Sequence, residues 1–371
     1  MKVTFPHMGN IYIPLKAFFE KLNIQVVVPP KCTKQTLELG VKYSPEFACL
    51  PLKITIGNFI EAIENGADTI VMAGGIGPCR FGYYCEVQRE ILQNLGYKFN
   101  MIVLEPPKGN LIDLITNLKH ITNKKENGIT DIYDAAKLGW EKAILLDDLD
   151  KKTATFRPTE INKGDTDKIY NKIVNLIDSA TEIDDLKNIK LNMDNMFKYV
   201  PHDARRQTVK IGIIGEIYTV LEPFANLNIE KQLGCLGVEV NRNIYITDWV
   251  RLNLFPSFLK PKEHKKFLDL AKPYINHFVG GHGQETVAQV AWLSKQGYKG
   301  AIHLLPFTCM PEIVAKSVLP GISKKYDIPV MTLVIDEHSA ETGLRTRLEA
   351  FVDMIKHKTE VENFDKVFAR N

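Results

Sequence analysis

Several kinds of sequence signal are absent from this 371-residue chain. No apolar run approaches the roughly 20 residues of a membrane-spanning helix, and the first residues lead into a strand pattern rather than a secretory leader. The 47 Lys and Arg residues nearly balance the 44 Asp and Glu residues, so the net charge of +3 gives no reason to expect a nucleic acid partner. We therefore expect a cytoplasmic protein that binds neither membrane nor nucleic acid.

Phosphate-binding loops and compact cysteine motifs are absent too. Neither G-x-G-x-x-G nor G-x-x-x-x-G-K-[ST] occurs, and Pro78 removes a backbone N–H from the one glycine-rich stretch that resembles a phosphate cradle. The six cysteines include no Cys-x-x-Cys pair, which makes zinc knuckles and ferredoxin-type runs poor fits. Any ATP that the chemistry requires is therefore expected to bind to another protein.

Short apolar runs alternate with helical patterns in two parts of the chain, which is typical of parallel α/β sheets. Strands are predicted at 2–5, 25–28, 69–73 and 101–104, and again at 209–214, 237–246, 301–305 and 330–335. The sequence between these parts is more polar, and its apolar residues recur at helical spacing. We predict an N-terminal α/β domain over 1–110, a mainly helical middle segment over 111–205 and a C-terminal α/β domain over 206–371.

The two α/β parts resemble one unit used twice. Gly-Asn-Ile-Tyr at 9–12 matches Gly-Glu-Ile-Tyr at 215–218, and the block 49–79 has the same helix, glycine stop and strand as the block 280–309. The sequence thus predicts two flavodoxin- or Rossmann-like parallel-sheet domains, related by an internal duplication, with a helical middle insertion. Because sites in such sheets form at the carboxyl ends of the strands, loops of both domains should meet at one cleft.

Three cysteines, Cys49, Cys79 and Cys309, occupy positions where a strand is expected to give way to a helix. Each has proline or glycine nearby instead of lying within an apolar stripe. A helix N-terminus favours an anion, so we expect all three to be thiolates. Thiolate sulfur selects zinc or iron–sulfur clusters. We predict that these cysteines are metal ligands, and three ligands to a four-iron cluster would leave one iron open.

Four further residues are predicted to contribute to cofactor binding. Gly75 and Gly77 would let backbone N–H groups approach cluster sulfur, and Arg80 would offset the negative charge of the thiolates. His282, flanked by glycines in the loop equivalent to that of Cys49, is either an acid, base or ligand or a solvated loop residue. No catalytic residue is assigned.

The other cysteines are less distinctive. Cys85 lies one turn into the helix after Cys79, and Cys32 follows two prolines and a lysine at the end of a predicted strand. Either is a further ligand or a buried bystander. Cys235 lies late in a helical connection, where a packing role is sufficient.

Four longer motifs surround these positions: Cys-Leu-Pro-Leu-Lys at 49–53, Gly-Gly-Ile-Gly-Pro-Cys-Arg-Phe-Gly-Tyr-Tyr at 74–84, Leu-Pro-Phe-Thr-Cys-Met-Pro-Glu at 305–312 and Thr-Gly-Leu-Arg-Thr-Arg-Leu-Glu-Ala-Phe at 342–351. Together they resemble the acyl-CoA dehydratase activase-related proteins, within the wider group of 2-hydroxyacyl-CoA dehydratase and benzoyl-CoA reductase subunits. The resemblance implies an oxygen-sensitive [4Fe-4S] protein of anaerobic metabolism whose cluster is held by Cys49, Cys79 and Cys309. It also implies an ATP-dependent activator as electron donor, an acyl-CoA as candidate substrate, and a homodimer or a heterodimer with a related subunit.

Two functions stay open. In the first, the protein receives low-potential electrons and uses them in reductive or radical chemistry related to 2-hydroxyacyl-CoA dehydration, which requires a dry acyl pocket beside Cys79 and Cys309. In the second, it is a non-catalytic electron-transfer or cluster-handling accessory with its cluster near the surface. A double-cubane cluster is a minor alternative to the [4Fe-4S] cluster. A structural zinc protein is disfavoured, because three distant cysteines have no evident fourth ligand.

Overall fold

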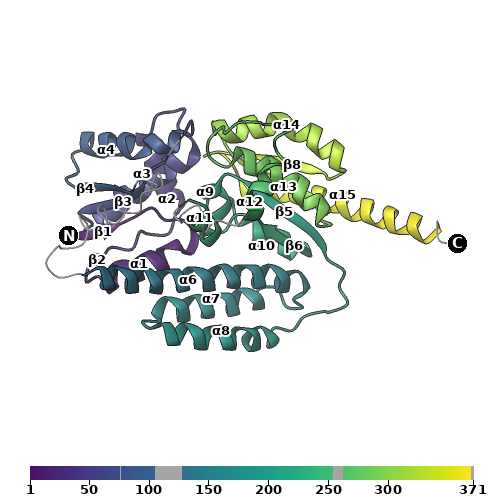
Figure 1. Ribbon diagram of the computed structural model, residues 1–371, viewed down its shortest axis with the longest axis horizontal. Helices are drawn as coiled ribbons and strands as arrows, with labels where there is room; N and C mark the ends of the chain where they lie inside the picture. Colours follow the sequence, from purple (N-terminus) through teal and green to yellow (C-terminus); the bar gives the residue numbers. More distant parts are fainter. Residues whose placement is uncertain (76, 105–127, 254–261, 369–371) are drawn as a thin grey trace.

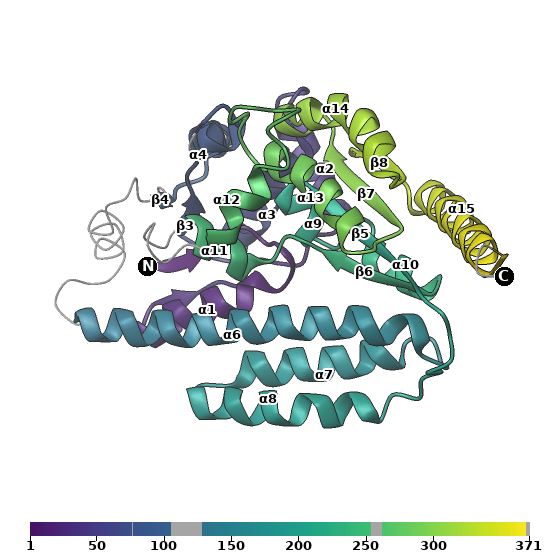
Figure 2. The same ribbon diagram turned by 45° about the vertical axis from the view of Figure 1, so that its right-hand side comes forward.

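The computed structural model describes residues 1–75, 77–104, 128–253 and 262–368 (Figure 1). Two α/β domains lie side by side, and a layer of long helices runs beneath both of them (Figures 1 and 2). Each domain contains a four-stranded sheet whose strands are all parallel, which confirms the predicted α/β class with two parallel-sheet domains. Within the described ranges, no helix is both long enough and apolar enough to cross a membrane.

The first sheet has the strand order β2-β1-β3-β4. Its strands are β1 (Lys2–Thr4), β2 (Gln25–Val26), β3 (Thr69–Ala73) and β4 (Asn100–Leu104). Around them lie η1 (Gly9–Ile11), α1 (Tyr12–Lys21), α2 (Lys34–Tyr43), α3 (Leu50–Glu64), η2 (Arg80–Tyr83) and α4 (Tyr84–Asn94). The central strand β1 is short, and its Val3 pairs with Val26 on one side and Thr69 on the other.

The second sheet has the equivalent order, β6-β5-β7-β8, as a repeated unit requires. Its strands are β5 (Val209–Gly215), β6 (Val238–Arg242), β7 (Gly300–Pro306) and β8 (Val330–Ile335). Its helices are α9 (Ile217–Leu221), α10 (Ile229–Cys235), α11 (Ile246–Asn253), α12 (Lys262–Leu268), α13 (Gly283–Lys295), α14 (Met310–Tyr326) and α15 (Glu341–Phe368). The strand predicted at 237–246 is too long, because the chain leaves the sheet after Arg242 and begins α11 at Ile246.

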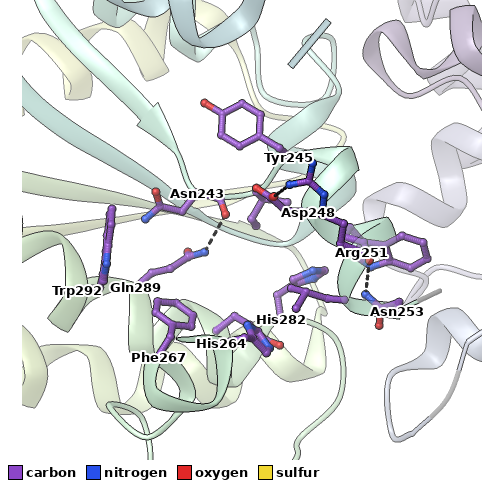
Figure 3. A pocket seen from close by; sticks show the side chains of 14 residues that line it. Asn243, Tyr245, Asp248, Arg251, Asn253, His264, Phe267, His282, Gln289 and Trp292 are labelled. Carbon is purple, nitrogen blue, oxygen red and sulfur yellow. Dashed lines mark hydrogen bonds and ion pairs between the residues drawn. The ribbon is translucent and has the colours of Figure 1, made fainter. Parts of the chain in front are cut away.

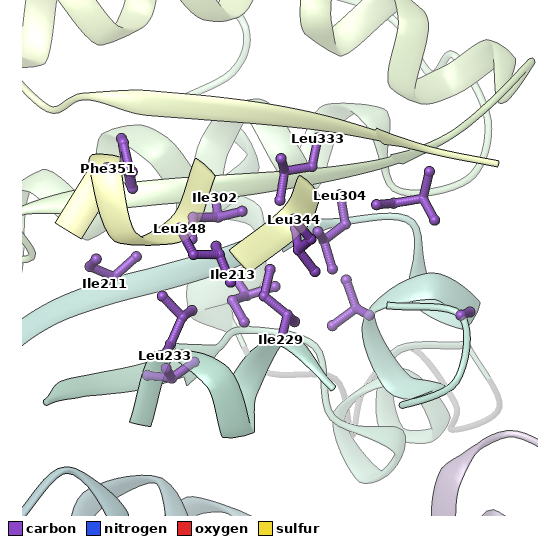
Figure 4. Packing of buried hydrophobic residues seen from close by; sticks show 14 of the residues in the cluster. Ile211, Ile213, Ile229, Leu233, Ile302, Leu304, Leu333, Leu344, Leu348 and Phe351 are labelled. Carbon is purple, nitrogen blue, oxygen red and sulfur yellow. The ribbon is translucent and has the colours of Figure 1, made fainter. Parts of the chain in front are cut away.

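The core of the second domain forms where α10 and α15 cover one face of its sheet (Figure 4). Ile213 of β5 and Ile302 of β7 lie against Leu348 of α15 and Leu233 of α10. Alternate residues of β5 and β7 face this cluster, so the strand pattern read from the sequence fixes which side chains it contains.

The layer beneath the domains consists of α6 (Ile129–Phe156), η3 (Arg157–Thr159), α7 (Asp165–Ser179) and α8 (Ile183–Lys198) (Figure 2). Arg242 at the end of β6 joins this layer to the second domain through ion pairs with Asp150 of α6 and Glu230 of α10. The expected boundary at 110/111 lies outside the described residues.

Helix α3 is buried on all sides because it lies between the cores of the two domains. Leu50 and Ile54 pack into the core of the second domain, whereas Ile56 and Phe59 pack under the first sheet. A helix that is apolar all round is typical of such a position. Cys49 is the N-cap of this helix, so both cores determine where its sulfur lies.

Two glycines allow α2 and α3 to cross with their backbones in contact. A Cβ atom at Gly57 would lie 1.8 Å from the carbonyl oxygen of Thr36, and one at Gly40 would lie 1.7 Å from that of Lys53. Backbone atoms cannot yield as a flexible side chain can. Only glycine therefore fits at either position without moving one helix away from the other.

We predict that Gly57→Ala lowers the free energy of unfolding by about 2 kcal/mol or more, because the overpacking outweighs alanine's helix propensity advantage of about 1 kcal/mol. Gly321→Ala in α14 is the matched control, since a Cβ there meets no atom within 4 Å. It should be neutral or slightly stabilising. Urea unfolding of both variants measures the difference, and equal midpoints would contradict the close helix crossing.

Candidate metal centre

The three predicted ligand cysteines are N-caps. Cys49 precedes α3, Cys79 precedes the 3-10 helix η2, and Cys309 precedes α14, each with extended backbone dihedrals. Cys79 and Cys309 follow β3 and β7 as expected. The expectation of a strand before Cys49 is wrong, because the preceding element is helix α2. All three cysteines nevertheless lie at the start of a helix.

Arg80 connects the loops that carry these cysteines. Its guanidinium donates hydrogen bonds to the Phe47 carbonyl (3.1 Å), and to the carbonyl and hydroxyl oxygens of Thr308. Phe47 lies two residues before Cys49, and Thr308 directly precedes Cys309. Thr308 has a left-handed φ of 64°, and its hydroxyl also donates to the Phe47 carbonyl (3.1 Å). One side chain thus holds loops from both domains together.

The glycine loop before α13 closes over Cys79. A Cβ atom at Gly280 would lie 2.6 Å from the Cys79 nitrogen, and one at Gly281 would lie 3.8 Å from its sulfur. Gly280 and Gly281 have φ values of 88° and 48°. The loop equivalent to that of Cys49 in the second domain therefore lies directly on a cysteine of the first domain.

Burial controls the protonation of these thiols in the metal-free protein. It is the largest cause that raises the pKa of Cys49, to about 12, and it also raises the pKa values of Cys79 and Cys309. The nearby carboxylate of Glu216 raises all three further, and Arg80 lowers those of Cys49 and Cys79. Desolvation therefore outweighs the helix N-termini in the pKa of these thiols, and their expected thiolate form as metal ligands stays a prediction.

Charge on one of these cysteines affects the others: Cys79 raises the pKa of Cys49, and Cys49 raises that of Cys309. The three sulfurs are thus neighbours, but they are spread more widely than ligands of one ion. In the described part of the chain, a different group has its three ligand atoms all within 4.8 Å of one another. Sulfurs that share one zinc ion at about 2.3 Å lie within about 4 Å of each other.

The predicted glycines shape the loop that precedes Cys79. A Cβ atom at Gly75 would lie 2.9 Å from the Gly82 Cα, and one at Gly77 would lie 2.4 Å from the ring of Phe278. Gly77 also has a positive φ of 96°, which favours glycine. Their predicted role in presenting amides to a cofactor stays a prediction.

His282 caps α13 and lines a cavity of about 390 Å³ that has both polar and aromatic side chains (Figure 3). Gln289 and Trp292 of α13 lie on one wall, and Asp248 and Arg251 of α11 lie opposite (Figure 3). The loop of His282 also contacts Cys79 through Gly280 and Gly281. This loop therefore links the cavity to one of the three cysteines.

Three polar atoms of this cavity are buried without a hydrogen-bond partner among the described residues: Glu285 Oε2, Gln289 Oε1 and Asn243 Nδ2. Burial raises the pKa of Glu285 to about 7 and lowers the pKa of His282. Near neutral pH the cavity thus presents a carboxyl group poised between its two forms and an uncharged imidazole. These groups suit a polar ligand or proton transfer.

A second cavity, of about 300 Å³, is lined almost entirely by apolar side chains. Phe5, Phe81 and Met72 line it together with Tyr84, whose hydroxyl hydrogen-bonds to the Cys49 sulfur. None of the three cysteines lines this cavity, and the acyl pocket expected beside Cys79 and Cys309 stays a prediction.

The remaining cysteines lie elsewhere. Cys85 is buried in α4 within the core of the first domain, and Cys32 is buried beside His7 and Glu222. Cys235 is exposed at the end of α10, so the packing role expected for it is wrong. The sequence reading missed Glu216 and Glu285. Glu216 lies in the repeated Gly-Glu-Ile-Tyr motif, which could have marked it as a site residue. No motif in the sequence marks Glu285.

A model of the family described as the CoA enzyme activase uncharacterised domain matches residues 7–243, well over half of the chain. The chain belongs to this family. The match includes Cys49 and Cys79 but ends before Cys309, and no curated protein matches the chain. It agrees with the predicted resemblance to activase-related proteins. The wider relationship to dehydratase and reductase subunits stays a prediction.

We predict that Glu285 makes the protein less stable as the pH rises. Its folded-state pKa of about 7 lies above the ordinary glutamate pKa of 4.5, so its contribution to stability is complete below pH 4.5 and is lost as the pH rises through 7. Relative to Glu285→Gln, the wild type should lose about 2 kcal/mol between roughly pH 5 and pH 8. Urea unfolding at both pH values checks this; parallel losses in the two proteins would refute it.

Proposed function

We propose that Cys49, Cys79 and Cys309 hold a [4Fe-4S] cluster between the two α/β domains, and that the protein uses it in low-potential electron transfer linked to a CoA enzyme. The main support is the convergence of three helix-capping thiols from both domains, whose loops Arg80 connects. When bound, such a cluster supplies one-electron transfer and one iron without a cysteine ligand.

The donor set favours this cofactor over zinc. Soft thiolates select zinc or iron–sulfur clusters, and the sulfurs are spread more widely than one zinc ion requires. A cluster binds each cysteine through a different iron, so wider spacing suits it. The Gly280–Gly281 backbone lies close enough to Cys79 to contact a cluster sulfur, and amide contacts of this kind tune a cluster's potential.

The surrounding residues would balance and orient the ligands. Arg80 and the helix N-termini would offset part of the negative charge of three thiolates. Tyr84 would hold the Cys49 sulfur by its hydroxyl. The carboxylate of Glu216 caps α9 by accepting hydrogen bonds from the Tyr218 and Thr219 N–H groups, and it adds a negative charge that Arg80 would help to offset.

The cavities favour a protein that acts on a substrate over an electron-transfer accessory. One cavity is apolar and is lined by Tyr84, which contacts the Cys49 sulfur, and the other is lined by His282 and Glu285, whose loop contacts Cys79. An acyl group suits the first cavity, while the second offers groups that exchange protons near neutral pH. We therefore propose reductive or radical chemistry related to 2-hydroxyacyl-CoA dehydration.

The electron donor in this proposal is a separate ATP-dependent activator. The sequence has neither common phosphate-loop motif, so ATP hydrolysis is assigned to that partner. An activase family name also allows the opposite assignment, in which this chain delivers the electrons. The experiments below separate the two.

Replacing Cys49, Cys79 or Cys309 singly by Ser should remove or destabilise the cluster while the chain stays folded, since the sheets anchor the loops. Iron and sulfide analysis and the visible spectrum of anaerobically purified protein measure the loss, and circular dichroism checks the fold. Cys235→Ser, the same change at an exposed cysteine, should retain all iron. A colourless wild-type protein, or iron content indifferent to the three changes, would overturn the proposal.

We predict that ATP alone does not reduce the protein, and that reduction needs both ATP and an activator. Purified protein, an ATP-dependent activator, ATP and a low-potential donor are mixed, and electron paramagnetic resonance follows the cluster. Reduction without activator and ATP would indicate a conventional electron carrier. ATP hydrolysis by this chain alone would assign it the activator's role instead.

A further inference from the structure

His7, Cys32 and Glu222 form a second group of ligand-type side chains, separate from the three cysteines above. They are 6%, 8% and 2% exposed, and one ligand atom from each lies within 4.8 Å of the others. His7 follows β1 and Cys32 follows β2 in the first domain, while Glu222 caps the C-terminal end of α9 in the second. Nothing in the proposed electron-transfer function uses them.

Backbone N–H groups orient the Glu222 carboxylate, which accepts from Gly9 at 2.7 Å and from Phe224 at 3.1 Å. Such outer contacts fix ligand direction in metal sites. The main-chain N–H of His7 donates to Asn58 Oδ1 at 2.8 Å, which holds the backbone of the loop that carries His7.

Asn58 also positions the loop of Cys32, because its amide donates to the Pro30 carbonyl at 2.8 Å. One residue of the buried helix α3 therefore holds both loops of the first domain that face Glu222. The Cys32 sulfur makes a long contact of 3.8 Å with the Tyr218 hydroxyl. Its bonding capacity is thus little used.

The distances are close to those of a single tetrahedral ion. His7 Nδ1 and Glu222 Oε2 are 2.9 Å apart. Nitrogen and oxygen ligands that each bind zinc at about 2.0–2.2 Å lie about 3.3 Å apart, and a thiolate ligand lies about 3.5 Å from either. The ligand atoms of all three residues lie within 4.8 Å of one another, so side-chain adjustments of about an ångström would bring them to the spacing of a zinc site.

We propose that His7, Cys32 and Glu222 bind one zinc ion, which fastens the β1 and β2 loops of the first domain to α9 of the second. Imidazole nitrogen, thiolate sulfur and carboxylate oxygen are the three donors that zinc takes in proteins. The fourth position falls to water or to the Tyr218 hydroxyl. Because the ligands come from both domains, the ion stabilises their arrangement and supplies no redox chemistry.

Cobalt provides the direct test, because Co²⁺ bound to thiolate shows a charge-transfer band and tetrahedral Co²⁺ shows intense visible bands. The background is the Cys49→Ser/Cys79→Ser/Cys309→Ser triple variant of the full chain, which removes the other ligand cysteines. We expect one equivalent of Co²⁺ with both features, displaced by Zn²⁺. Addition of Cys32→Ser should abolish the thiolate band and weaken Zn²⁺ binding by about 100-fold or more.

Two controls keep the result interpretable. Cys235→Ser in the same background should leave both bands unchanged. If the triple variant does not fold, zinc content of the anaerobically purified wild type, Cys32→Ser and Glu222→Gln decides: zinc lost from both variants supports the site. Cobalt bound without a thiolate band, or zinc content indifferent to Cys32→Ser, reduces the group to a hydrogen-bonded pair with a nearby thiol and overturns the proposal. Iron analysis of the same samples reports on the cluster independently.

Discussion

The burial of helix α3 between two hydrophobic cores is the constraint on which the rest of the site depends. Its Lys53 is 3% exposed and pairs with Glu337 of the second domain at 2.5 Å. Loss of Glu337 would leave the buried Lys53 ammonium without its partner, which is destabilising because a buried charge needs compensation. Helix α3 is therefore fixed relative to both sheets. The position of α3 in turn fixes Cys49 at its N-cap and Asn58 in its interior.

Charge explains why the cysteine region suits a cation. Glu216 and the buried Glu312 both lie near the thiols, and each raises the pKa of Cys309. Arg80 is a positive group near Cys49 and Cys79, and its guanidinium donates hydrogen bonds to Phe47 and Thr308. Without a metal, protons on the thiols keep the site close to neutral. A metal centre can replace those protons, because a coordinated thiol is deprotonated.

The regular part of the structure could be predicted because it follows from local pattern. Strands β3 and β8 lie at the predicted residues, since continuous β-branched and apolar runs between clear turns leave little ambiguity. The end of β6 was missed because Asn243–Tyr245 still looks strand-like, although the chain turns there into α11. The end of the β5–β6 pairing depends on tertiary contacts, which the local sequence pattern does not show.

The site was only partly predictable for the same reason. Cys79 and Cys309 were recognised by the loops that follow their strands, and Cys49 by its proline-rich helix start. The contacts of Arg80 with Phe47 and Thr308 span more than 30 and more than 220 residues, so no motif could show them. Protonation depends on burial, which is a property of the assembled domains. The sequence therefore indicated candidate ligands but not the burial that governs their protonation.

The Gly280–Gly281 loop of the second domain packs directly against Cys79 of the first domain. One wall of the centre is backbone from the second domain, and a thiol that it covers belongs to the first. Neither domain alone supplies this wall, because the Gly280–Gly281 backbone and the Cys79 thiol come from different domains. A cofactor bound as proposed would therefore have its full set of contacts only after the two domains have packed together, so its retention would depend on their relative placement.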